Sequence, residues 1–139
     1  MNVTTLLSRV LMCAMLSSAT GFVDAQDAGV MEEALQNCDR DQQTMNFCAR
    51  HRYDVADKTL NQVYRDSMTK QQDKAARQRM RDAQRAWITY RDKDCLAQNG
   101  PREMSGSIWP LQHFACLEQH TLRRTEDLRQ QACGMEGCR

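Results

Sequence analysis

Glycine and proline are scarce in this chain of 139 residues, which holds six glycines and two prolines. Neither residue occurs between positions 41 and 99. No stretch alternates apolar and polar residues as a half-buried strand does, which argues against a β fold. The sequence therefore predicts an all-α protein. We expect a small, disulfide-stapled antiparallel bundle of three helices, with a short fourth helix as the alternative.

An excess of charge of either sign is also missing. The chain has 19 Lys and Arg against 18 Asp and Glu, which gives a net charge of +1. A nucleic-acid-binding domain normally shows a basic excess or a basic stripe, so we expect no nucleic-acid partner. Electrostatic contacts with any partner must be local.

No apolar run approaches the roughly 20 residues that a membrane span needs. The run at 10–16 is short and follows the positively charged Arg9, while Val23 and Ala25 place small residues at the positions of a cleavage site. This pattern predicts a secretory signal over residues 1–25, with a membrane anchor as the alternative. A lipoprotein anchor on Cys13 is disfavoured, because Met12 stands where such a signal has a small residue.

The mature chain after residue 25 is short enough to form one domain, residues 26–139. We expect it to be periplasmic or secreted, with no membrane span. Seven cysteines become six once Cys13 leaves with the signal. An even set in an exported chain predicts disulfides, and a zinc site is the weaker alternative because only one close cysteine pair is present.

The predicted helix hairpin restricts the cysteine pairings. If it turns near residue 70, Cys48 and Cys95 lie at nearly the same level, and Cys116 reaches the same end of the bundle. We favour three pairs, with Cys48–Cys95 as the alternative. The favoured pairs are Cys38–Cys48, Cys95–Cys116 and Cys133–Cys138.

Catalytic motifs are absent. There is no His-Glu-x-x-His motif, no Gly-rich phosphate loop and no nucleophile elbow. His113 and His120 share a helix face but lack further ligands, and Asp92 and Asp94 diverge because they are two residues apart. Disulfides would also consume the thiolate that a catalytic cysteine needs. We therefore expect neither an enzyme nor a metal or cofactor site.

The first part of the mature chain, residues 26–41, is polar without a sustained period, and we expect an extended lead-in. Thr44 is a good N-cap for a first helix that reaches about Ser67. Apolar residues then recur at threes and fours, as on an amphipathic helix. The expected inner face comprises Met45, Cys48, Val55, Ala56, Leu60, Val63 and Tyr64.

A second helix is expected over residues 71–98, because Thr69 and Gln72 have the spacing of a capping box and Gly100 and Pro101 end the pattern. Its expected buried side carries Ala76, Met80, Ala83, Trp87 and Tyr90. A loop over 102–107 leads to a third helix, which Ser105 or Ser107 caps and whose first turn accepts Pro110. The expected inner face of this third helix carries Leu111, Ala115, Leu122 and Leu128.

Three residues in this plan raise a question of role. Arg91 either forms a solvated pair with Asp92 or lies partly inside, where it would need a carboxylate partner such as Asp57. Trp87 is expected in the core. Trp109, at a boundary between loop and helix, is expected to be exposed. We favour the interpretation that it covers the end of the bundle, and the alternative is that it serves as a contact anchor.

Four blocks of the chain together resemble a known family. They are Met45-Asn46-Phe47-Cys48-Ala49; Ala56-Asp57-x-x-Leu60-Asn61-x-x-Tyr64; Gln84-Arg85-Ala86-Trp87-Ile88-x-Tyr90-Arg91-Asp92-x-x-Cys95; and Gly106-Ser107-Ile108. The blocks resemble the LprI-like lysozyme inhibitor domain of exported bacterial proteins, over about residues 38–128. Most of the motif has the character of a scaffold.

The resemblance implies a helical fold and a protein partner, a lysozyme or another peptidoglycan hydrolase, whose muramidase activity the domain blocks. The family's namesake is a lipoprotein, and membrane anchoring is not implied here because the lipobox is missing. We expect the contact region to be the loop over residues 99–109, with Glu103 and Trp109 as candidate contacts. The alternative is a periplasmic interaction or immunity protein with a different partner and no effect on lysozyme.

Overall fold

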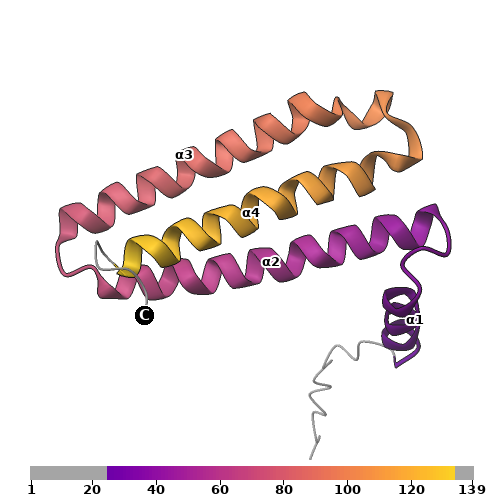
Figure 1. Cartoon of the computed structure of the whole chain (residues 1–139), viewed down its shortest axis with the longest axis horizontal. Helices are drawn as coiled ribbons and strands as arrows, with labels where there is room; N and C mark the ends of the chain where they lie inside the picture. Colours follow the sequence, from indigo (N-terminus) through magenta and orange to yellow (C-terminus); the bar gives the residue numbers. More distant parts are fainter. Residues whose placement is uncertain (1–24, 134–139) are drawn as a thin grey trace, which may run out of the picture.

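The computed structural model describes residues 25–133 (Figure 1). Nearly all of the expected signal segment, and residue 138 as the expected partner of Cys133, lie outside the described residues. The described part contains helices and no strand, which confirms the predicted all-α class. Its elements are α1 (Ala25–Gln36), α2 (Gln42–Lys70), α3 (Lys74–Asn99), η1 (Arg102–Met104), η2 (Gly106–Ile108) and α4 (Trp109–Cys133), where η denotes a short 3₁₀ helix.

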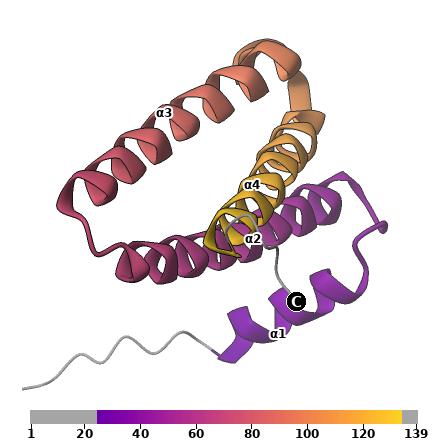
Figure 2. The same ribbon diagram turned by 60° about the vertical axis from the view of Figure 1, so that its left-hand side comes forward.

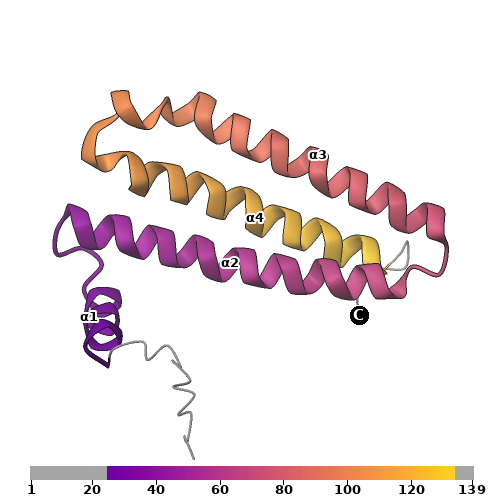
Figure 3. The same cartoon turned by 180° about the vertical axis from the view of Figure 1, so that it is seen from behind.

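The helix α1 stands where we expected an extended lead-in, so that expectation was wrong. Alanine and glutamate, which favour helices, are frequent in this segment, but its apolar side chains form no continuous stripe. The segment therefore carries a helix propensity without the periodicity that sequence reading detects. In Figures 1 and 3, α1 lies across the beginning of α2 and extends away from the other helices.

Aspartates cap both long helices of the hairpin, rather than the threonines that we expected. The Asp41 carboxylate accepts the Thr44 backbone N–H at 2.8 Å, and the Thr44 hydroxyl accepts the Asp41 N–H at 3.1 Å. Thr44 is thus the third residue of a capping box and not the N-cap. Asp73 caps α3 through the N–H groups of Ala75 and Ala76, so the expected Thr69–Gln72 box is not used.

The three long helices run up, down and up. In Figure 1, α2 and α4 run in the same direction. The helix α3 runs in the opposite direction, from the end of α2 to the beginning of α4. The contact between α2 and α4 is the most extensive in the described part, while α3 packs mainly against α4. Figure 2 shows that α3 begins beside the end of α2 and diverges from α4 toward this N-terminal end. The bundle is therefore a tight helix pair to which a third helix is attached.

The apolar core lies chiefly between α2 and α4, where Leu60 and Leu128 are fully buried. In α3 the buried residues are Gln84, Arg91 and Cys95, which are spaced by seven and four positions on one stripe. Several expected core positions are wrong. Val55, Ala83, Tyr90, Ala115 and Leu122 are exposed, whereas Leu117, Thr121 and Thr125 supply the buried face of α4 instead.

Two of the three favoured disulfides are present. Cys38–Cys48 joins the segment after α1 to α2, and Cys95–Cys116 joins the C-terminal part of α3 to α4. The alternative Cys48–Cys95 pairing is thereby excluded. The second disulfide closes a loop of 21 residues and holds the end of the bundle from which the α3–α4 connection emerges.

Candidate functional site

A polar junction around Arg91 attaches α3 to its neighbours. The Arg91 side chain is only 8% exposed, and its Nε donates to the Asp92 carboxylate at 2.9 Å. Its Nη1 donates to the Thr121 hydroxyl of α4 at 3.4 Å and lies 3.8 Å from the Asp57 carboxylate of α2. Arg91 therefore connects three helices, and the interpretation that it lies inside and reaches Asp57 is confirmed.

Aromatic rings complete this junction. The Arg91 guanidinium lies 5.1 Å from the centre of the half-buried Trp87 ring and 5.6 Å from that of Tyr53. Both distances suit a cation–π contact, which is strengthened where water is excluded. Burial raises the pKa of Tyr53, while the positive charge of Arg91 opposes that rise. The ring faces thus stabilise the buried positive charge of Arg91, which purely apolar neighbours would not stabilise.

A second buried contact lies two turns away along α3. Arg124 of α4 donates from Nε to the buried Gln84 side-chain oxygen at 3.0 Å, and its guanidinium lies 6.0 Å from the Trp87 ring centre. Desolvation lowers the pKa of Arg124, against the attraction of Asp127. Gln84, Trp87 and Arg91 therefore form the inner face of α3, which is mostly polar.

The other residues of the family motif occupy several places. The structure brings Asn61 to Asp57, at 2.8 Å, and thus to the edge of the Arg91 junction. Arg85 is exposed beside Asp82, and Tyr90 is exposed with its ring edge-on to His120. The remaining four comprise Leu60, which is buried, Tyr64, which is half-buried, and Gly106 and Ser107, which lie in the α3–α4 connection.

Asn46 is a structural residue whose role the sequence did not reveal. It lies on α2, but its side-chain oxygen accepts the Leu111 N–H of α4 at 3.2 Å. Its amide donates to the Ser107 carbonyl at 2.8 Å. Asn46 thus satisfies the first turn of α4 from another helix, in place of the local serine cap that we expected. The signal was a polar residue inside an apolar block, Met45 to Cys48.

The α3–α4 connection, residues 100–108, is the candidate contact loop. Hydrogen bonds hold it in place: Trp109 Nε1 donates to the Gly100 carbonyl at 2.9 Å, and the single proton of the Ser105 hydroxyl is within reach of the Asn99 and Pro101 carbonyls, at 2.9 and 3.0 Å. Gly100 adopts a positive φ of 68°, a conformation that favours glycine. These contacts fix the loop's shape.

Trp109 belongs to the base of this loop rather than to its exposed surface. Its ring stacks on His113, with centres 4.2 Å apart and planes at 14°, and it is half-buried. The expectation of an exposed Trp109 was wrong, whereas its half-buried position agrees with the interpretation that it covers the end of the bundle. Burial lowers the pKa of His113, which favours a neutral ring against the indole.

The exposed side of the contact loop carries a different candidate anchor. Met104 is 84% exposed, which is the highest fraction among the large apolar residues of the described part. Glu103 and Arg102 are also exposed beside it. A single exposed methionine needs no explanation on an ordinary surface. Here it stands on a pinned loop, where a partner could bury it at little ordering cost.

One grouping of metal-ligand atoms occurs in the described part. The sulfurs of Cys95 and Cys116 and a ring nitrogen of His120 lie within 4.8 Å of one another. The two sulfurs are bonded to each other, so neither offers a thiolate. His120 Nε2 contacts the Asp94 carboxylate at 2.9 Å. Among the helices of the described part, none is long and apolar enough to cross a membrane.

Comparison with known proteins agrees with the motif. The chain is 35% identical over 101 residues to an uncharacterized protein of Rhizobium meliloti, which covers 64% of this chain and 72% of the relative. It is 23% identical over 135 residues to the uncharacterized protein YecT of Escherichia coli, which covers 86% of this chain and 83% of that protein. No solved structure gives a significant match.

The sequence profile described as lysozyme inhibitor LprI matches residues 36–128. That range includes both disulfides, the Arg91 junction and the contact loop. The match spans well over half of the chain, and the chain belongs to the lysozyme inhibitor LprI family.

Proposed function

We propose that this protein is an exported inhibitor that binds a peptidoglycan muramidase and blocks its substrate cleft, without catalysing a reaction itself. The observation that carries the proposal is the pinned, exposed loop over residues 100–108 on a member of the lysozyme inhibitor LprI family. A loop whose conformation is already fixed loses little conformational entropy when it enters a cleft.

The contacts would be divided between two side chains. Met104 supplies a flexible apolar group that adapts to a pocket, as methionine commonly does at binding surfaces. Glu103 supplies a local negative charge toward a basic enzyme, although the neighbouring Arg102 reduces the net field. Trp109 supports both from behind through its hydrogen bond to Gly100.

Export is part of the same proposal. The disulfides Cys38–Cys48 and Cys95–Cys116 are typical of an oxidising compartment. Together with the signal pattern of residues 1–25, they support a periplasmic or secreted domain that begins at residue 26. Mass spectrometry of the envelope or secreted fraction should find the N-terminus near Gln26, and a cytoplasmic chain that retains residue 1 would contradict export.

The direct test is the turnover of peptidoglycan by purified muramidases of several classes in the presence of excess inhibitor. We expect at least one class to lose activity in proportion to the occupied fraction of enzyme. Unchanged turnover in every class would contradict muramidase inhibition. In that event, a photo-crosslinker placed at position 104 would identify the different partner of an interaction or immunity protein.

A further inference from the structure

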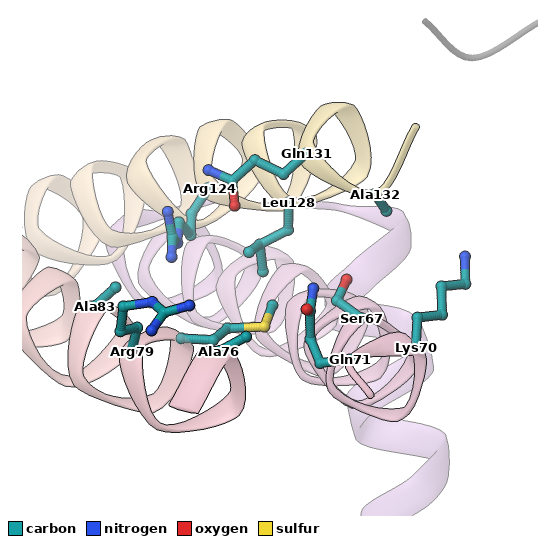
Figure 4. Close-up of a pocket in the computed structure, with 11 residues that line it drawn as sticks. Ser67, Lys70, Gln71, Ala76, Arg79, Ala83, Arg124, Leu128, Gln131 and Ala132 are labelled. Atoms are coloured by element: carbon teal, nitrogen blue, oxygen red, sulfur yellow. The ribbon is translucent and has the colours of Figure 1, made fainter. Parts of the chain in front are cut away.

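The end of the bundle opposite the contact loop contains a pocket of about 520 Å³. Its lining residues come from the end of α2, the first half of α3 and the end of α4. Figures 1 and 2 show that α3 stands apart from α4 at this end while it remains joined to α2. Figure 4 shows Arg124 and Leu128 projecting from α4 into this space, with Arg79 on α3, Ser67 on α2 and Gln71 directly after α2. The volume lies within the range of small-molecule sites.

The charged residues that line this pocket are all basic. Its lining includes the basic residues Lys70, Arg79 and Arg124 and no acidic residue. Arg79 lies 3.8 Å from the exposed Asp73 carboxylate, which is a weak, solvated pair. Asp127 is the acidic group that acts on Arg124 from its own helix, although Arg124 is not part of any ion pair shown in the described residues.

Arg124 is the critical group because it is half-buried. Its Nε donates to Gln84, an uncharged partner, while one ring face of Trp87 lies beside the guanidinium. A desolvated guanidinium gains most from a carboxylate or phosphate that accepts its remaining N–H groups. The charge is therefore oriented into a pocket whose basic lining supplies no anion.

The floor of the pocket is apolar. The half-buried Met80 and Ala76 line it together with the basic groups, and Leu128 is fully buried beside them. A simple inorganic anion would leave the exposed part of this apolar surface in contact with water, whereas an alkyl chain of several carbons would cover it.

We propose that this pocket binds a small amphiphilic anion, in which a carboxylate or phosphate head contacts Arg124 and Arg79 and a short alkyl chain lies against Met80 and Ala76. The site is independent of the contact loop, which lies at the other end of α3 and α4. It would give the protein a ligand in addition to its protein partner.

The two tryptophans provide a test within one spectrum. Trp87 lies beside Arg124, and Trp109 lies at the contact loop. Titration of the ¹⁵N-labelled protein with octanoate or octyl phosphate should shift the indole N–H resonance of Trp87 saturably and leave that of Trp109 in place. The ligand that binds more tightly shows whether the pocket prefers a carboxylate or a phosphate head group. Acetate and octanol, which each lack one half of the ligand, should bind at least about tenfold more weakly.

Variants separate the pocket from general charge. Arg124→Gln should weaken octanoate binding about tenfold, which corresponds to the loss of one charge-assisted contact. Arg79→Gln, an exposed change that leaves the Gln84 contact intact, should weaken it severalfold. Arg123→Gln removes the same charge from the neighbouring exposed position and should have no effect.

Three results would overturn the proposal. One is the absence of a saturable Trp87 shift with either octyl anion. Another is equal binding of octanol, which would make the pocket merely apolar. The third is an Arg123→Gln effect as large as that of Arg79→Gln. That result would show that the anion is attracted by the net charge of the protein and not by the pocket.

Discussion

Arg91 shows how a single residue can organise a thin core. Its charge is enclosed by two aromatic rings, a threonine hydroxyl and two carboxylates that remain partly exposed. A buried charge of this kind is costly to leave without partners. Its contribution therefore lies in fixing where α3 sits, since the apolar surface that α3 offers is small.

Replacement of Arg91 by Met keeps a similar side-chain volume but removes the hydrogen bonds of the junction. It should therefore lower the free energy of unfolding by about 2 kcal/mol. Asp57→Asn should cost less than about 1 kcal/mol, since the Asp57 side chain is 37% exposed. Urea unfolding of both single variants and the double variant measures their coupling. An Arg91→Met variant as stable as the wild type would show that the junction does not stabilise the bundle.

Asn46→Ala should lower the free energy of unfolding by about 1–2 kcal/mol, because the Leu111 N–H and the Ser107 carbonyl lose their partner. Gln78→Ala is the matched control, since Gln78 forms hydrogen bonds only on its own exposed helix surface, with Asp82 and Arg81. Thermal unfolding would compare them. Equal effects of the two substitutions would contradict a capping role for Asn46.

At the scale of elements, the helices differ in how they are attached. The α2–α4 pair shares the apolar core, whereas α3 is held by the polar junction and by Cys95–Cys116. Removal of a disulfide that closes a loop of 21 residues costs about 3 kcal/mol in the chain-entropy account. That loss of stability should affect α3 first, because α3 has the least apolar contact with the other long helices.

A Cys95→Ser, Cys116→Ser double variant should therefore show faster amide exchange in α3 than in α2 or α4. The Cys38→Ser, Cys48→Ser double variant is the control, and its faster exchange should be confined to α1 and the start of α2. Hydrogen exchange followed by mass spectrometry resolves these segments. A uniform increase along all three long helices in the first variant would show that α3 is not a separable unit.

The aspartate caps make the helix starts sensitive to acid. The Thr44 backbone N–H chiefly lowers the pKa of Asp41, with a further contribution from Arg40, and the Ala76 and Ala75 N–H groups lower the pKa of Asp73. Since both pKa values are depressed by folding, the stabilisation is present above the unfolded value of 3.8 and is lost as the pH falls through the lower folded value.

Asp41→Asn and Asp73→Asn should change stability little near neutral pH, because asparagine is also a good cap. Between about pH 5 and pH 2.5, each variant should lose less stability than the wild type, since one titrating cap is gone. Urea midpoints at both pH values test this. A pH dependence identical to that of the wild type in both variants would contradict the role of these carboxylates.

At the scale of the whole molecule, the sequence predicted the helical class, two disulfides and the break between α2 and α3. Those features follow from local signals: the shortage of glycine and proline, the register of the cysteines and a capping pattern near residue 70, although Asp73 rather than Thr69 supplies the cap. The rotation of α3 was not predicted, because large apolar residues such as Tyr90 were assumed to point inward. The buried stripe instead carries Gln84 and Arg91, whose partners belong to other helices.

The same reasoning applies to the contact loop. Its position between two helices could be read from Gly100 and Pro101. Which side chain it exposes could not, because Trp109 turns inward through a hydrogen bond and a ring stack that depend on the folded loop. Met104 became the candidate anchor only once Trp109 had been placed.

If the loop over residues 100–108 is the surface that blocks a muramidase, a substitution in this loop should weaken inhibition while one elsewhere should not. Inhibition constants should be measured for the wild type, for Met104→Lys in the loop and for Val30→Lys, which changes an exposed apolar residue of α1. We predict at least about thirtyfold weaker inhibition by Met104→Lys, the effect expected of a contact worth 2 kcal/mol or more, and an unchanged constant for Val30→Lys. Equal inhibition by all three proteins would contradict the claim.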